Sequence, residues 1–176
     1  FYNEGSCATI AAAWGTEKGQ CQWMAYGDSV VFHYSLQTGL LEHSFTRLAD
    51  FSNPPRLVSC KDSLEEEGFR SGVFHLDDTS VVFAASDALS HYCLMMYELS
   101  KSAEFESELM EVRMKQTTNL QLLQMAEKER FDFNEDVLMP LLRSADSEDS
   151  FKDLLESLYA KKLIDIDDYT LAILYA

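Results

Sequence analysis

The hydrophobic pattern of the chain changes character near residue 86. Before it, short apolar or alternating runs separated by glycines are typical of β-strands. The predicted strands are Ser6–Trp14, Gln20–Tyr26, Val30–Leu36, Val73–Leu76 and Ser80–Ala85. The first three are expected to form a meander, and the last two a hairpin that turns at Asp77-Asp78. Residues 49–72, with two consecutive prolines and an acidic run, are expected to be a surface excursion.

Beyond Ser86 the apolar positions recur with helical spacing. We predict one helix carrying Leu89, Cys93, Met96 and Tyr97 on one face, then helical stretches at Ser102–Glu127 and Glu135–Arg143. The clearest helix follows Ser147, with apolar residues at i, i+3, i+4 and i+7, an acidic first turn and Lys161-Lys162 at its end. A last strand is predicted at Tyr169–Tyr175. Because this strand must pair, the helices at about 101–160 are interpreted as an insertion in one sheet-based domain, residues 1–176.

Charge and composition narrow the classes of function. The chain has 176 residues, 14 basic and 30 acidic, for a formal net charge of −16, and 47% of its residues are hydrophobic. This charge disfavours binding to nucleic acid or to an anionic membrane. We see no apolar run long enough to span a bilayer and no signal-peptide pattern. The cysteines Cys7, Cys21, Cys60 and Cys93 are too scattered for a zinc cluster or a disulfide framework, which indicates reduced thiols in a cytoplasmic protein.

Three aspartates occupy similar positions, each where an apolar strand meets a turn or a helix. They are Asp28, Asp87 and Asp167. A carboxylate beside a buried strand needs hydrogen bonds or a cation to compensate its burial. Asp87 alone would be explained as the cap of a helix beginning near Ala88, and Asp28 as the brace of a tight turn. Together, three oxygen ligands without a competing His or Cys suit a hard divalent ion such as Mg²⁺ or Mn²⁺.

The residues around these aspartates resemble a known family. Gly27-Asp28-Ser29, Ser86-Asp87-Ala88 and Asp167-Asp168-Tyr169-Thr170 are similar, in the same order, to three motifs of the metal-dependent protein phosphatases of the PP2C type. The family's versions read Gly-Asp-Ser, Ser-Asp-Gly and Asp-Asn-x-Thr. Gly5-Ser6-Cys7-Ala8 also resembles the Gly-Ser-Thr-Ala that opens the strand before the first motif. The resemblance covers roughly residues 5–100 and 160–176.

The resemblance implies both a fold and an activity. The fold would be α+β, a four-layer α-β-β-α sandwich of two antiparallel sheets with flanking helices, here incomplete at its N-terminus. Asp87 and Asp167 would be ligands of two Mn²⁺ or Mg²⁺ ions, and Asp28 would serve a third, weaker ion. A water activated by these ions would hydrolyse phosphoserine or phosphothreonine esters in a phosphoprotein substrate, as in signalling hydrolases.

Departures from the family pattern leave alternatives open. Ala88 stands where the family has Gly, and Asp168 where it has Asn. The family's earlier motifs, including an Asp whose carboxylate bridges both metals, would lie upstream of Gly5, so we expect activity from the full-length parent and not from this chain alone. One alternative is a PP2C-like pseudophosphatase that acts as a binding or regulatory module. Another is that the helical stretch Ser102–Leu158 is the working part and docks a protein partner.

Two further patterns in the sequence concern an esterase motif and the histidines. Gly27-Asp28-Ser29 also matches the nucleophile block of the Gly-Asp-Ser-Leu esterases. There the serine begins a helix, whereas Ser29 precedes a β-prone run and no Asp-x-x-His follows near the C-terminus. His33, His43, His75 and His91 show no metal-ligand spacing and are interpreted as surface or packed residues.

Overall fold

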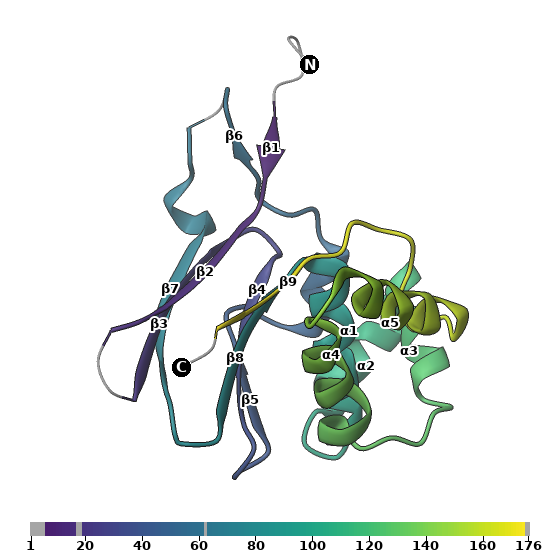
Figure 1. The fold of residues 1–176 in the computed structure, drawn as a ribbon. Coiled ribbons are helices and arrows are strands. Elements are labelled where there is room, and N and C mark those ends of the chain that lie inside the picture. The colour runs from purple at the N-terminus through teal and green to yellow at the C-terminus, as the bar shows by residue number, and fades with distance from the viewer. Residues whose placement is uncertain (1–5, 17–18, 62, 175–176) are drawn as a thin grey trace. The chain divides into compact units, whose positions relative to one another are not determined.

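The structure is a computed structural model that describes residues 6–16, 19–61 and 63–174 (Figure 1). The chain divides into two compact units, which are described separately below. The first comprises residues 1–45, 54–87 and 172–176, and the second comprises residues 46–53 and 88–171. The first unit contains the strands and the second contains the helices. The chain is thus an α+β protein, as its hydrophobic pattern predicts.

The strands of the first unit form three small sheets (Figure 1). The strands are β1 Cys7–Ala8, β2 Ile10–Gly15, β3 Gln20–Tyr26, β4 Val30–Ser35, β5 Leu40–His43, β6 Val58–Ser59, β7 Phe69–His75, β8 Ser80–Ala85 and β9 Leu171–Leu174. β1 pairs with β6, β7 with β3 and β3 with β2, and the third sheet has the order β5-β4-β8-β9. The pairs β1–β6, β2–β3, β3–β7, β4–β5 and β4–β8 are antiparallel.

The core of the first unit lies between its two larger sheets. Cys21 and Phe74 come from one sheet, Val31 and Val82 from the other, and together they form one buried cluster. Small residues of β2 and the ring of Trp23 pack against this cluster, as does Leu174 of β9. Trp23 and Phe74 stack with their ring centroids 5.6 Å apart. The two sheets therefore face each other across a shared apolar layer.

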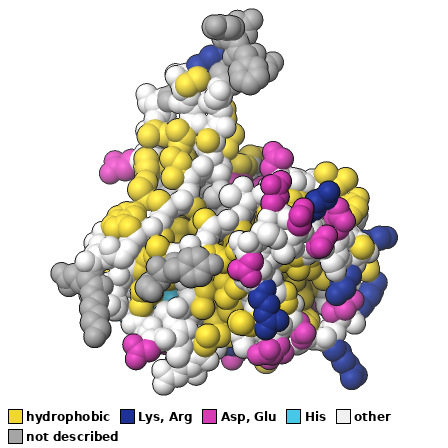
Figure 2. Space-filling view, viewed as in Figure 1, with side chains coloured by type: hydrophobic (Ala, Val, Ile, Leu, Met, Phe, Trp, Pro, Cys, Tyr) yellow, Lys and Arg dark blue, Asp and Glu magenta, His cyan; other side chains and the backbone are white. Residues whose placement is uncertain are grey.

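The sheet β2–β3–β7 is apolar on its other face as well. The register places Ile10 opposite Tyr26 and Tyr26 opposite Phe69, while Trp14 lies opposite Gln22 and Gln22 opposite Val73. The side chains of Ile10, Trp14, Phe69 and Val73 are exposed. Figure 2 shows hydrophobic side chains gathered over β2 and β7, whereas charged side chains on the same view lie mostly over the helices.

Strand positions were predicted better than strand partners. The strand Gln20–Tyr26 is confirmed residue for residue, and Val30–Leu36 to within one residue. The predicted meander is confirmed for its first two strands, because β2 and β3 pair antiparallel, and is wrong for the third, because β3 and β4 belong to different sheets. The predicted hairpin is also wrong, because β7 pairs with β3 and β8 pairs with β4, although the chain does turn at residues 76–79 between them.

The segment predicted to be a surface excursion contains regular secondary structure. Residues 49–72 contain most of a short 3-10 helix at Leu48–Ser52, strand β6, a second 3-10 turn at Glu66–Gly68 and the first half of β7. No strand was predicted at the position of β5. The predicted strand Ser6–Trp14 divides at Thr9 into β1 and β2, and Gly5, the first residue of the Gly5-Ser6-Cys7-Ala8 segment, lies outside the described residues.

The second unit contains five α-helices (Figure 1). They are α1 Asp87–Ser100, which begins on the last residue of the first unit, α2 Glu106–Met114, α3 Thr118–Ala126, α4 Met139–Ser144 and α5 Glu148–Ala160. The predicted helical stretch Ser102–Glu127 is divided into α2 and α3 by an extended segment around Lys115. A π-helical turn at Phe133–Leu138 leads into α4.

Helix α5 begins and ends as its sequence predicts. Ser147 is its N-cap, and the Ser147 hydroxyl oxygen accepts the backbone N–H of Ser150 at 3.1 Å. Glu148 and Asp149 occupy the first turn, where the helix dipole favours negative charge. The helix ends at Ala160, followed by Lys161-Lys162.

The helices lie in the sequence between β8 and β9, which are neighbours in one sheet. The prediction that the last strand pairs is therefore confirmed, and its start is at Leu171 instead of Tyr169. No helix in the described ranges is long and apolar enough to cross a bilayer. Cys7, Cys21, Cys60 and Cys93 form no disulfide bond in the described structure.

Candidate metal site at one end of the β4–β8 pair

Asp28 and Asp87 emerge from the same end of one strand pair. In the antiparallel register, Val30 at the start of β4 lies opposite Ala85 at the end of β8. Asp28 precedes Val30 by two residues, and Asp87 follows Ala85 by two residues. Both side chains are half-buried. The structure therefore places two of the three predicted ligands at a common sheet end, where two carboxylates repel each other unless a cation compensates them.

The loop that carries Asp28 has a backbone that requires glycine. Gly27 has φ +91°, and a Cβ built there would lie 2.5 Å from Thr9 Cγ2 and 2.8 Å from the carbonyl oxygen of Arg56. On the other side of Asp28, the hydroxyl oxygens of Ser29 and Thr9 are 2.7 Å apart and share a hydrogen bond. Asp28 is thus held in a tight bend, as the alternative of a turn-bracing residue also predicts.

Arg70 on β7 brings a positive charge to the same loop. Its guanidinium donates a hydrogen bond to the backbone carbonyl of Gly27 and lies 4.9 Å from the ring centroid of Phe45. Burial lowers the pKa of this guanidinium, and the Asp28 carboxylate partly offsets that effect. Burial also lowers the pKa of His43, and the charge of Arg70 adds to the effect. Asp28 therefore has a cationic neighbour supplied by the chain itself.

Arg70 was missed by the sequence reasoning, although a signal for it exists. It lies in the segment interpreted as a surface excursion, yet it stands opposite Ala25, whose side chain is fully buried. A single Arg within a strand of small and apolar residues indicates a specific partner, because a charged group is costly in such a place.

Asp87 is the first residue of helix α1. The helix N-terminus stabilises a carboxylate at this position. The position of Asp87 is therefore the one expected both for a helix cap and for a metal ligand. Ala88 lies within the helix and does not have a positive φ. The methyl group that stands where the PP2C family has glycine therefore causes no backbone strain here.

Asp167 lies in the loop before β9, within the second unit. It is exposed, and its carboxylate oxygen accepts the backbone N–H of Asp168 at 2.8 Å. Two residues earlier, the carboxylate of Asp165 accepts the N–H of Ile166 in the same way. The predicted position at the start of the last strand is confirmed to within a few residues.

Among residues 6–16, 19–61 and 63–174, no group of three or more His, Cys, Asp or Glu side chains is arranged to hold a metal ion. The assignment of Asp28, Asp87 and Asp167 as metal ligands stays a prediction. No protein-family model matches the chain, and neither the curated proteins nor the solved structures include a match.

Proposed function

We propose that this chain is part of a metal-dependent serine/threonine protein phosphatase of the PP2C type, acting on phosphoproteins in the cytoplasm. The observation that carries the proposal is the convergence of two motifs, Gly27-Asp28-Ser29 and Ser86-Asp87-Ala88, on one end of the β4–β8 pair. The third motif stands at the opening of the last strand, as the resemblance requires.

The fold proposed with this function is a four-layer sandwich with helices outside two antiparallel sheets. Two features of the first unit support it. Its larger sheets face each other across the cluster around Val31 and Phe74. The outward face of β2–β3–β7, with Ile10, Trp14 and Val73 exposed, is apolar enough to carry a helical layer.

In the proposed function Asp28 and Asp87, at one end of the β4–β8 pair, supply carboxylate oxygens, the ligands that Mn²⁺ and Mg²⁺ prefer, and Asp167 is proposed as a further ligand from its motif alone. The bound ions supply a water of lowered pKa and offset the charge on the phosphoryl oxygens. The chain's own contribution is positional. The Gly27 bend and the Ser29–Thr9 hydrogen bond fix the Asp28 loop, and Arg70 reduces the repulsion between the carboxylates.

The test is Mn²⁺-dependent hydrolysis of a phosphothreonine peptide by the full-length protein that contains this chain. Asp87→Asn is expected to lower kcat/KM by about 100-fold or more, because ligand loss affects the ions directly. Asp78→Asn is the matched control, since Asp78 is an exposed residue in the turn at the opposite end of β8. A full-length protein without activity would contradict the proposal, as would equal rates for the two variants.

The second candidate is a PP2C-like pseudophosphatase that binds partners without catalysis. The position of Arg70 favours it, because a guanidinium already compensates Asp28 without a metal ion. Asp168, an acid in place of the family's Asn, points the same way. Calorimetric titration of the full-length protein with Mn²⁺ separates the candidates. The enzyme must bind Mn²⁺ and lose it on Asp167→Ala, whereas the pseudophosphatase has no such requirement.

A further inference from the structure

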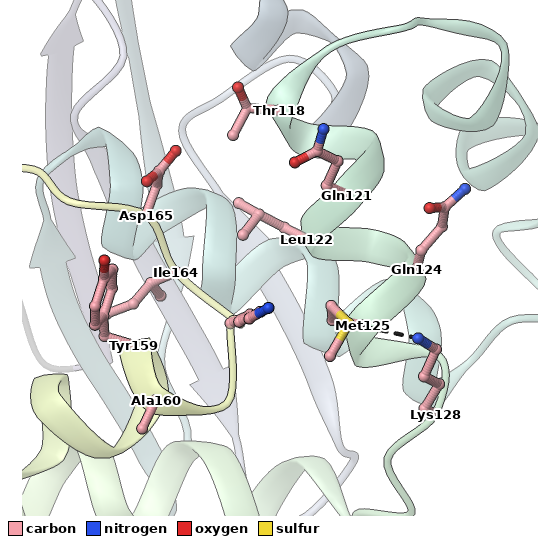
Figure 3. Close-up of a pocket in the computed structure, with 11 residues that line it drawn as sticks. Thr118, Gln121, Leu122, Gln124, Met125, Lys128, Tyr159, Ala160, Ile164 and Asp165 are labelled. Carbon is pink, nitrogen blue, oxygen red and sulfur yellow. Dashed lines mark hydrogen bonds between the residues drawn. The ribbon is translucent and has the colours of Figure 1, made fainter.

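The second unit contains a pocket that the phosphatase motifs do not explain. It is an open hollow of about 540 Å³ between α3 and the segment at the end of α5 (Figure 3). This volume is within the usual range for sites that bind small organic molecules. The pocket is lined by Thr118, Gln121, Leu122, Gln124, Met125, Lys128, Tyr159, Ala160, Lys162, Ile164 and Asp165.

The lining combines an apolar surface with polar groups. Leu122 and Met125 project from α3 toward the pocket, and Ile164 lies on the opposite side with the ring of Tyr159 (Figure 3). The side-chain amides of Gln121 and Gln124 add hydrogen-bond donors and acceptors. Such a surface suits a ligand that has an apolar body and a polar end.

Two ammonium groups give the pocket its charge preference. Lys128 and Lys162 line it, and neither forms an ion pair with another residue in the described part of the chain. Lys128 donates to the Met125 sulfur at 3.5 Å, a weak contact that leaves its charge uncompensated. Asp165 is the one acidic residue in the lining. In a chain with 14 basic and 30 acidic side chains, a lining that holds two lysines without ion pairs points to an anion.

Lys162 is held at a backbone position that normally belongs to glycine. The N–H of Lys162 bonds to the carbonyl of Tyr159 at 2.9 Å, and the N–H of Leu163 bonds to the carbonyl of Leu158 at 3.0 Å. These two bonds define a Schellman motif whose left-handed residue is Lys162, with φ +59°. No other non-glycine residue in the described ranges has a positive φ. A lysine here is strained relative to glycine, and strained positions of this kind gather at binding sites.

We propose that this pocket binds a small organic anion with an apolar body, with Lys128 and Lys162 contacting the anionic group and Leu122, Met125 and Ile164 contacting the body. Phosphate-type and carboxylate head groups share this chemistry, because lysine recognises both as a point charge. The proposal concerns the second unit alone and does not depend on the proposed phosphatase activity.

The experiment is a titration of the ¹⁵N-labelled 176-residue chain, followed by amide chemical shifts in buffer with EDTA. The probes are phenylphosphonate, phenylacetate, benzyl alcohol and inorganic phosphate. Phenylphosphonate and phenylacetate are expected to shift residues 118–128 and 159–165, and the tighter of the two identifies the head group. Benzyl alcohol lacks the charge and inorganic phosphate lacks the body, so each is expected to bind at least about tenfold more weakly.

Four variants test the roles of the lysines. Lys162→Gly is expected to weaken phenylphosphonate binding about tenfold while raising the thermal midpoint, because glycine relieves the backbone strain. Lys128→Gln is expected to weaken binding similarly. Lys162→Arg keeps the charge and should bind within about threefold of the parent chain. Lys152→Gln removes an exposed lysine of α5 that does not line the pocket, and should have no effect.

Three outcomes would overturn the proposal. One is equal affinity for benzyl alcohol and the two organic anions, which would mean that the pocket does not distinguish a charged ligand from a neutral one. Another is unchanged affinity in Lys162→Gly and Lys128→Gln. The third is a set of chemical-shift changes outside the lining residues, or none with any probe.

Discussion

At the scale of single residues, the second unit buries two titratable groups with opposite effects on stability. Glu98 is 2% exposed, its Oε2 has no hydrogen-bond partner in the described structure, and burial with the nearby charge of Glu108 raises its pKa to about 8. His91 is 4% exposed, and burial lowers its pKa to about 4. Folding therefore keeps Glu98 protonated and His91 neutral over much of the range between pH 4 and pH 8.

Glu98→Gln is expected to remove the loss of stability that the parent chain shows as the pH rises. Between its unfolded pKa near 4.5 and its folded pKa of about 8, Glu98 keeps in the folded state a proton that the unfolded state releases. The contribution of Glu98 to the free energy of unfolding therefore falls by on the order of 3 kcal/mol between pH 5 and pH 8, and above about pH 6.5 the contribution of His91 no longer offsets this fall. Urea unfolding at several pH values measures it.

The control for this prediction is Glu104→Gln, which neutralises an exposed carboxylate shortly before α2. It should leave the pH profile unchanged. A parallel pH profile for Glu98→Gln and the parent chain would contradict the conclusion that Glu98 keeps its proton in the folded state. In Glu98→Gln the free energy of unfolding should instead fall as the pH drops below about 6.5, because Glu98 no longer offsets the contribution of His91; in Glu104→Gln and the parent chain the two contributions largely cancel between about pH 4.5 and pH 6.5.

At the scale of elements, the bend between β3 and β4 moves the chain from one sheet to the other. Gly27→Ala is expected to destabilise the chain by about 2 kcal/mol or more, because alanine is strained at φ +91° and its Cβ would clash with Thr9 and the Arg56 carbonyl. Urea unfolding followed by tryptophan fluorescence measures the change. Gly15→Ala is the matched control, since no atom lies within 4 Å of a Cβ at Gly15, and it should stay within about 0.5 kcal/mol of the parent. Equal stability of the two variants would contradict the structural role of the bend.

The elements also mark the limits of sequence-based prediction. β3 and α5 were predicted well because local signals define them: a run of β-prone residues bounded by Gly19 and Gly27, and Ser147 before an acidic turn. Strand partners were not, because β7 and β8 look like a hairpin in sequence while their backbone hydrogen bonds go to different sheets. Partner choice depends on contacts between residues far apart in the chain, which no local pattern encodes.

The same distinction applies to the candidate sites. The strand-end positions of Asp28 and Asp87 were predictable, because each follows an apolar run directly. Arg70 and the pocket were not predicted. Lys128 and Lys162 line the same pocket although they lie far apart in the sequence. The one local signal for the pocket is a lysine at a helix end, where glycine is usual.

At the scale of the whole molecule, the net charge of −16 acts against compactness through self-repulsion. Raising NaCl from about 20 to about 300 mM is expected to raise the thermal midpoint of the chain by a few degrees, because the Debye length shortens. MgCl₂ at the same ionic strength is expected to raise it further, since binding of Mg²⁺ to the folded state adds to screening. The extra increment should disappear in the double variant Asp28→Asn, Asp87→Asn.

The control is again Asp78→Asn, which makes the net charge one unit less negative and does not change the proposed site. This variant should still have a higher thermal midpoint in MgCl₂ than in NaCl. Equal midpoints in NaCl and MgCl₂ at matched ionic strength would show that screening accounts for the whole effect, and that the acidic pair at the end of the β4–β8 sheet does not hold the ion.

The pairing of β8 with β9 also bears on how the chain is made. Residues 86–170 separate the two strands, so the edge of β8 that receives β9 stays open while the ribosome synthesises the entire helical unit. During that time the edge is able to pair with strands of other nascent chains. Overproduction should therefore lower the yield of native protein without changing its final stability. Slow translation through residues 86–170 should have the same effect.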